Sequence, residues 1–349
     1  MVETKDKTKF LDDLGGNERE LTQPESTTLD KLNEIRDIII KEYNSRNNYL
    51  FLNTFMKEAY EEINNRLDEL TSDLKYKEID LKNFIYANSN LDLGDSAATL
   101  GAYSAYLLDK LNLDFFYING FKNHFDHLFQ GSSNCKNLII ESINGFDVGA
   151  NISNSGLLAF INIKGDQIGT HAANERKTNN VFYINNNGKD IGISVAEFGE
   201  ASFIAYINNK GEYIGRESGH SAEIDTFLAI NNVGINYLRS IIMNGELNNL
   251  VLIENKGFNP LEHIGSDGGK IKNAYFIDND YSTNKNIKNL FIVNSKILEN
   301  DDKDQSVIKY EKLIKQKNLQ NIVKLANNPD QCTGEDFAKY LVKISEEIR

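Results

Sequence analysis

Five glycines in the middle of the chain recur at a fixed interval, and this period constrains the fold more than any other feature. Each glycine follows a short apolar run, and neighbouring members are 23 residues apart: Gly165, Gly188, Gly211, Gly234 and Gly257. A looser copy, Gly145, precedes the first of them by 20 residues. Self-similarity at a fixed period of roughly 20 to 50 residues is typical of solenoids and other repeat arrays.

The residues around each glycine repeat as well. An isoleucine stands four positions before all five glycines, and asparagines stand two and three positions before most of them. The asparagines three positions before the glycine include Asn185, Asn208 and Asn231. Because stacked strands place equivalent residues in columns, we expect an isoleucine column inside the stack and an asparagine ladder beside it. Glycine suits the tight turn that follows, often with a positive φ.

These columns predict a mainly β protein in which residues 113–298 form a parallel β-solenoid, a right-handed β-helix with 23 residues in each regular coil. The β-branched residues of the apolar runs favour strands, and the Gly and Asn residues that recur between the runs argue against helical repeats. The bare ends of a solenoid expose unpaired strand edges. We therefore expect each end of the solenoid to carry a helical cap.

The N-terminal third of the chain supplies one expected cap. Apolar residues at helical spacing in the region 27–112 predict a hairpin of two helices and then a third helix at 96–111. The third helix is rich in Ala and Gly, which favours close packing against a flat surface. The preceding residues, 1–26, are polar and lack periodicity, and this predicts a disordered tail.

The C-terminal region, residues 299–349, supplies the other expected cap. Apolar residues among many lysines predict one helix at 307–325. A polar break with a proline follows, and Thr333 has the character of an N-cap residue for a final helix.

Charge and composition exclude several classes of function. The chain has 51 acidic and 38 basic residues, a formal net charge of −13 at pH 7. This acidity argues against nucleic acid and anionic membranes as partners, because both are bound by clustered Lys and Arg. The two cysteines, Cys135 and Cys332, lie far apart and do not form a disulfide framework. Without a long apolar run or an apolar signal core, we expect a cytoplasmic protein.

A Gly-x-x-aliphatic-Gly motif occurs in three successive copies that begin at Gly165, Gly188 and Gly211. Between Gly145 and about Gly269 the chain resembles the repeats of the right-handed β-helix at the end of glutamate synthase large subunits. A similar domain forms one subunit of formylmethanofuran dehydrogenase. In those enzymes the solenoid is structural or supports a channel, and it carries no catalytic residues. The resemblance therefore implies a non-catalytic module and assigns no site residues.

One polar face of the repeat is the best candidate for a site. Glu197 and His220 both stand nine positions after a repeat glycine, so they should stack in neighbouring coils, about 4.8 Å apart. Arg216 and Glu217 are expected close by. A carboxylate, a histidine and an arginine on one face would suit anion binding or acid–base catalysis. The alternative interpretation is a solvated turn, because turns commonly carry exposed polar residues.

A His-x-x-His pair, His124 and His127, is a weaker candidate. At helical spacing both rings would face one side and could hold a metal ion, although no third ligand is evident nearby. The alternative is an amphipathic turn with the histidines at its rim. Phosphate-binding loops, dinucleotide fingerprints, nucleophile elbows and zinc motifs do not occur in the sequence. We therefore predict no cofactor.

The repetition itself favours a surface over a catalytic centre, because identical residues in every coil build a face. We expect a non-catalytic scaffold or interaction module that binds a protein partner, with a place in a larger complex. The alternative is an enzyme or a binder of a small anion or sugar that uses Glu197, Arg216, Glu217 and His220. A third hypothesis is end-to-end assembly into a homo-oligomer.

Overall fold

The computed structural model describes residues 26–43, 56–153, 156–174, 177–258, 263–277, 287–293 and 305–347. The predicted tail, residues 1–26, lies outside the described part except for Ser26, where a helix begins. In these ranges, no helix is long and apolar enough to cross a membrane.

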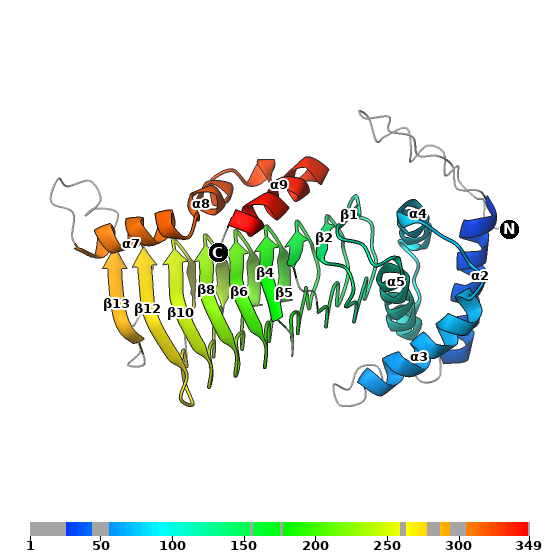
Figure 1. Cartoon of the computed structure of the whole chain (residues 1–349), viewed down its shortest axis with the longest axis horizontal. Helices are drawn as coiled ribbons and strands as arrows, with labels where there is room; N and C mark the ends of the chain where they lie inside the picture. Colours follow the sequence, from blue (N-terminus) through cyan, green and yellow to red (C-terminus); the bar gives the residue numbers. More distant parts are fainter. Residues whose placement is uncertain are drawn as a thin grey trace.

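The centre of the molecule is a parallel β-solenoid, as the sequence predicts (Figure 1). In the regular coils the register between neighbouring strands is 23 residues, so that Ile184 pairs with Ile207 and Ile207 with Ile230. A smaller four-stranded sheet runs in the order β11 (Lys256–Phe258), β9 (Val233–Ile235), β7 (Lys210–Ile214) and β5 (Asn187–Ile191). The large sheet has nine strands in chain order: β1 Phe116–Asn119, β2 Asn137–Glu141, β3 Leu157–Ile161, β4 Lys177–Ile184, β6 Glu200–Ile207, β8 Glu223–Ile230, β10 Glu246–Ile253, β12 Lys270–Ile277 and β13 Ile287–Val293.

The repeat glycines stand where successive coils approach each other most closely. Gly188 pairs with Gly211, and Gly211 with Gly234. A Cβ atom placed on Gly211 would lie 2.2 Å from the carbonyl oxygen of Gly188, which no side chain can tolerate. These three glycines lie on strands β5, β7 and β9 of the smaller sheet. The close approach of the coils, more than a positive φ, therefore requires glycine here.

The interior column of the solenoid is aromatic, and this corrects the expected isoleucine column. Phe160, Tyr183 and Tyr206 stand in register, are fully buried and stack on one another, with ring centroids 5.0 and 4.8 Å apart. The next residue in this column is Ala229, and the buried Phe227, two positions earlier on β8, stacks on Tyr206 with ring centroids 5.4 Å apart. The isoleucines at the next position in each strand point to the opposite face of the sheet, because side chains alternate along a strand. There they form a second core against the C-terminal helices.

Of the two expected asparagine columns, the one two positions before the glycine forms the ladder, and Asn185, Asn208 and Asn231 do not belong to it. The buried Asn209 accepts a hydrogen bond from the Asn186 amide at 2.9 Å and donates from Nδ2 to the Asn232 side chain at 3.0 Å. Asn185, Asn208 and Asn231 instead adopt φ values of 55°, 54° and 54° at the turns. Their side chains reach the C-terminal helical region, as in the bond from Asn208 to the Ala326 carbonyl.

The N-terminal helices cover the first coil, as expected of a cap (Figure 1). Every residue from 97 to 108 in the third expected helix is buried, and its small residues permit close packing. A Cβ on Gly101 would lie 2.2 Å from the carbonyl oxygen of His127 in the first coil. One helix, α4 at Glu78–Asn88, was not predicted from the sequence. The helices are α2 Ser26–Tyr43, α3 Met56–Thr71, α4 Glu78–Asn88, the short η2 Gly94–Ser96 and α5 Ala97–Leu111.

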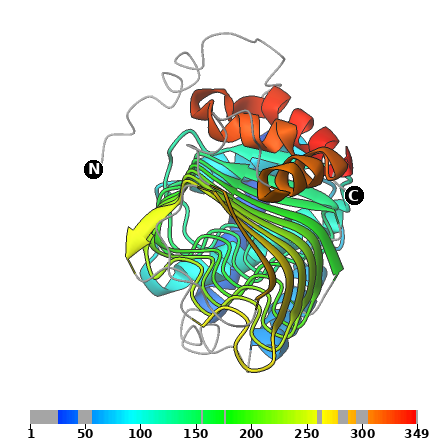
Figure 2. The same cartoon turned by 90° about the vertical axis from the view of Figure 1, so that its left-hand side faces the viewer.

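The C-terminal helices run along the side of the large sheet and do not close the end of the solenoid, where a cap was expected (Figures 1 and 2). Their apolar side chains pack on the outer isoleucine face of the strands. The predicted helix at 307–325 is divided at Asn318, whose φ is 51°. The elements are α7 Gln305–Gln316, α8 Gln320–Ala326, the short η3 Pro329–Gln331 and α9 Gly334–Glu347.

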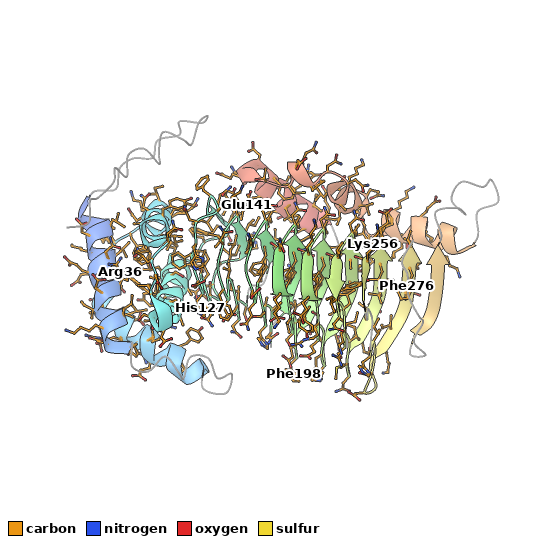
Figure 3. All side chains as sticks on the ribbon, turned by 180° about the vertical axis from the view of Figure 1, so that it is seen from behind. Arg36, His127, Glu141, Phe198, Lys256 and Phe276 are labelled. Atoms are coloured by element: carbon orange, nitrogen blue, oxygen red, sulfur yellow. The ribbon has the colours of Figure 1, made fainter. Side chains whose placement is uncertain are left out.

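One buried carboxylate joins the last helix to the solenoid. Glu141 ends strand β2 in register with Ile161, so a charge replaces the usual apolar residue of this column. It is fully buried and accepts hydrogen bonds from the hydroxyl groups of Tyr117 and Thr333 and, at 2.9 Å, from the amide of Gly334. Thr333 stands directly before α9, the position predicted for its N-cap residue. The hydrogen bond from the first backbone amide of α9, that of Gly334, is nevertheless accepted by Glu141 and not by Thr333. Figure 3 shows Glu141 beside these helices.

Candidate functional site

The turns that follow the smaller sheet bring Glu197 between two histidines. His220 Nδ1 lies 3.2 Å from Glu197 Oε1, and His171 Nδ1 lies 3.6 Å from Glu197 Oε2. The predicted contact of Glu197 with His220 is therefore present. The three side chains come from successive coils and are 22–35% exposed, so all of them reach solvent.

The surroundings of this pair are those of an open surface. The Phe198 side chain is 58% exposed, and its ring centroid lies 5.3 Å from that of His220. The backbone is held by the bond from the Glu197 amide to the Asn174 side chain at 2.9 Å. The arrangement can share a proton between carboxylate and imidazole. Figure 3 places Phe198 on the side of the solenoid away from Glu141.

Arg216 and Glu217, the other two predicted site residues, form a separate cluster. The Arg216 guanidinium lies over the Tyr213 ring, 4.6 Å from its centroid, and Arg216 Nε is 3.6 Å from Glu217 Oε1. Burial raises the pKa of Asp190, and the positive charge of Arg216 opposes that rise. Between described residues, no hydrogen bond or ion pair joins Arg216 or Glu217 to the Glu197–His220 pair. The four predicted residues therefore make two separate contacts, Glu197 with His220 and Arg216 with Glu217.

The two histidines of the His-x-x-His pair have different surroundings and do not share a helix face. His127 has a φ of 57°, which is incompatible with a helix, and it is buried beside Asp147 at 3.4 Å. His124 lies in an isolated bridge with Asn144 and pairs with Asp126 at 3.0 Å. In the described part of the chain, no group of three His, Cys, Asp or Glu side chains is arranged to hold a metal ion.

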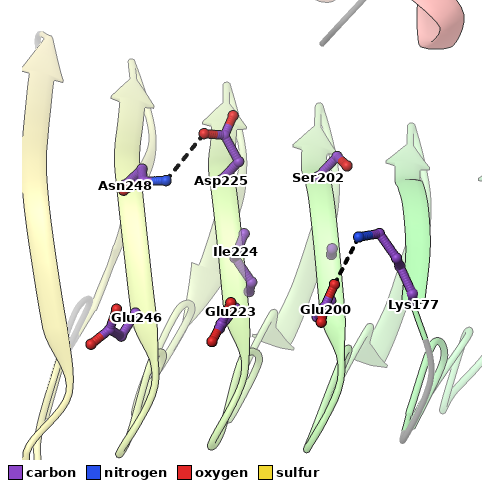
Figure 4. Close-up of a pocket in the computed structure, with 9 residues that line it drawn as sticks. Lys177, Glu200, Ser202, Glu223, Ile224, Asp225, Glu246 and Asn248 are labelled. Carbon is purple, nitrogen blue, oxygen red and sulfur yellow. Dashed lines mark hydrogen bonds and ion pairs between the residues drawn. The ribbon is translucent and has the colours of Figure 1, made fainter.

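A row of three glutamates, which the sequence interpretation missed, lies where the long strands of the large sheet begin. We call Glu200, Glu223 and Glu246 the acidic column, because they stand in register on strands β6, β8 and β10 (Figure 4). Lysines close the row at both ends, since Lys177 pairs with Glu200 in register and Lys270 with Glu246. The column therefore reads Lys-Glu-Glu-Glu-Lys along the solenoid axis.

The lysines neutralise the two outer glutamates of the acidic column. Lys177 Nζ lies 2.9 Å from Glu200, and Lys270 Nζ lies 2.8 Å from Glu246. The hydrogen bond that Glu246 accepts from Lys270 lowers the pKa of Glu246, and the hydrogen bond that Lys177 donates to Glu200 raises the pKa of Lys177. For Glu223, the middle member, no described cation lies within ion-pair distance. The column thus retains one uncompensated negative charge.

A shallow hollow lies over the acidic column. Ser202, Asp225 and Asn248 form its second row, two residues further along the same strands. Asp225 accepts hydrogen bonds from Lys317 at 2.7 Å and from Asn248 at 3.3 Å. The hollow has a volume of about 210 Å³, below the roughly 300–1,000 Å³ of pockets that enclose small molecules. Its position and size suit a chain lying across the surface.

The signal for the acidic column was present in the sequence. Its three glutamates stand twelve positions after Gly188, Gly211 and Gly234, so they follow the 23-residue period. Isolated glutamates at the start of strands resemble ordinary solvated residues, and only their register marks them as one row.

No protein-family model, no curated protein and no solved structure matches this chain, so the likeness to the glutamate synthase β-helix stays a prediction.

Proposed function

We propose that this chain is a non-catalytic scaffold of the cytoplasm that binds a protein partner along the side of its solenoid, as part of a larger complex. The observation that carries the proposal is the acidic column with its uncompensated Glu223. The carboxylates of the acidic column form a row along the molecule, whereas the side chains of a catalytic centre converge on one point.

The acidic column favours a basic, extended segment as the bound part of the partner. Successive carboxylates are about 4.8 Å apart, so the three span roughly 10 Å along the solenoid axis. Lys or Arg side chains on the same side of an extended peptide are about 6.6 Å apart, and flexible side chains bridge the difference. Such a peptide places one cation at Glu223 and hydrogen-bonds to the polar second row of the hollow.

A binding assay with a simple peptide tests this proposal. A fluorescein-labelled peptide of alternating Lys and Ser residues is titrated with the protein, and fluorescence anisotropy gives the dissociation constant. We expect saturable binding that weakens as salt is raised, because exposed charges are screened. Exposed ion pairs contribute about 0.2–1 kcal/mol, so Glu223→Gln should weaken binding by about 1.4- to fivefold.

Glu346→Gln is the matched control, because it removes the same charge from an exposed position on α9, outside the hollow. It should leave the dissociation constant unchanged within error. Equal weakening by both variants would mean that the peptide responds only to net charge and would refute the acidic column as the binding surface.

The Glu197–His220 pair carries a second candidate function, the binding of a small anion or sugar. The observation in its favour is the 3.2 Å contact beside the exposed ring of Phe198. Thermal-shift titrations with inorganic phosphate and with glucose test it. Stabilisation that Glu197→Ala and His220→Ala both abolish would support this candidate, and no stabilisation by either compound would reject it.

A further inference from the structure

The two ends of the solenoid are covered differently. At the N-terminal end, twelve consecutive buried residues of α5 lie against the first coil. At the other end, the large sheet finishes at β13 and the smaller sheet at β11. The C-terminal helices, which could have closed this end, extend along the side of the sheet toward Glu141 at the second coil. Viewed from this end, no drawn helix lies across the coils (Figure 2).

We propose that two copies of the chain associate end to end through strand β13, about a two-fold axis, to form a homodimer. This inference is independent of the proposed binding function of the acidic column. It concerns a different part of the molecule, the C-terminal edge of the large sheet.

Strand β13 has the properties of a pairing edge. It is seven residues long, pairs with β12 on one side, and has no partner strand on the other side among the described residues. Five of its residues are apolar and only one, Lys288, is charged. An edge strand presents a row of unpaired N–H and C=O groups, and edges of this length and composition pair with another chain unless they are protected. Proline, carboxylates and dense charge, the usual protection, are missing from β13.

The asymmetry of the ends selects the two-fold arrangement. Head-to-tail stacking would require β13 to dock on the first coil, but α5 already covers that coil. Two β13 strands can instead pair antiparallel with each other, because a strand is always complementary to itself about a two-fold axis. The chain carries a net charge of −13, yet strand β13 itself has no carboxylate, so the paired strands would add no acidic charge to the interface.

Mass and cross-linking together test the dimer. Light scattering after size-exclusion chromatography, from about 1 to 100 µM, should give twice the mass of one chain at the upper concentrations. For cross-linking, Lys288→Cys introduces a thiol into β13, whose seven residues span roughly 23 Å at about 3.3 Å per residue. A bismaleimide that bridges this span should give a covalent dimer. Both native cysteines are buried and do not compete.

Ser72→Cys is the matched control, because it places an exposed thiol in the N-terminal helical region, far from β13 along the chain. It should remain uncross-linked. A monomeric mass at every concentration would overturn the proposal, and so would cross-linking through position 72 but not through position 288.

Proline variants test the edge itself. Neighbouring residues of an edge strand direct their N–H groups to opposite sides. Of Asn289→Pro and Leu290→Pro, one should therefore lose only the outward donor and keep the circular-dichroism spectrum of the folded protein. We expect that variant to be monomeric. If it remains a dimer while folded, β13 is not the interface; if neither variant folds, the cross-linking comparison decides.

Discussion

The buried carboxylate of Glu141 gives the sharpest prediction about stability. Glu141→Ala removes the acceptor for three donors at once: the hydroxyl of Tyr117 at 2.7 Å, the hydroxyl of Thr333, and the amide of Gly334 at 2.9 Å. The residue is fully buried, so water cannot replace the lost acceptor. Leaving a buried donor unsatisfied costs about 1–3 kcal/mol, and partial relaxation around the site brings the expected total to about 3–5 kcal/mol.

Urea unfolding followed by circular dichroism measures this loss. Glu141→Gln keeps one acceptor oxygen and should cost about 1–2 kcal/mol, less than Ala, because a neutral amide accepts more weakly than a carboxylate. The exposed Glu346 on α9 is the control, and Glu346→Ala should change stability by less than about 0.5 kcal/mol. A loss below about 1 kcal/mol for Glu141→Ala would show that Glu141 does not hold α9 to the solenoid.

Three further predictions concern the solenoid core. Gly211→Ala should lower the free energy of unfolding by about 2–3 kcal/mol, since its Cβ would lie 2.2 Å from a carbonyl oxygen; an unchanged urea midpoint would contradict the close approach. Asn209→Ala removes three buried hydrogen bonds and should cost about 3 kcal/mol in the same assay, where a neutral effect would show that the ladder contributes nothing to stability. Burial raises the pKa of Cys135 to about 12 from 9.0 in the unfolded chain, so the folded state holds this proton more tightly. The contribution of the protonated Cys135 thiol to stability is present below pH 9 and is lost as pH rises toward 12. A thiol reagent at pH 8 should label Cys135 only on unfolding, and rapid labelling of the folded protein would contradict this.

The solenoid could be predicted because its period is carried by glycine. Only glycine fits where the carbonyl of Gly188 meets Gly211, so the 23-residue interval is imposed by geometry and is visible in one sequence. Which residues of each strand point into the solenoid could not be predicted in the same way. Tyr183 and Ile184 are both fully buried, one inside the solenoid and the other under the C-terminal helices. When both faces of a sheet are covered, hydrophobic alternation disappears and with it the signal for the interior.

A similar limit applies to the C-terminal end of the solenoid and to the site. Nothing in the composition of residues 305–347 distinguishes a cap from a lateral cover, because both need one apolar helix face. One residue could have indicated the lateral position of the C-terminal helices: Glu141, a carboxylate in a column of apolar residues. At the site, register alone correctly placed Glu197 beside His220, whereas Arg216 belongs to a different offset and contacts Tyr213.

The central claim is that the acidic column binds a basic partner segment, and the salt dependence of that binding tests it most directly. The measurement compares the dissociation constant of the Lys-Ser peptide at several salt concentrations for the native chain and for a triple variant, in which Glu200, Glu223 and Glu246 are all replaced by Gln. We expect that the native chain loses affinity steadily as salt rises and that the triple variant binds weakly at all salt concentrations. Native-like affinity and salt dependence in the triple variant would contradict it.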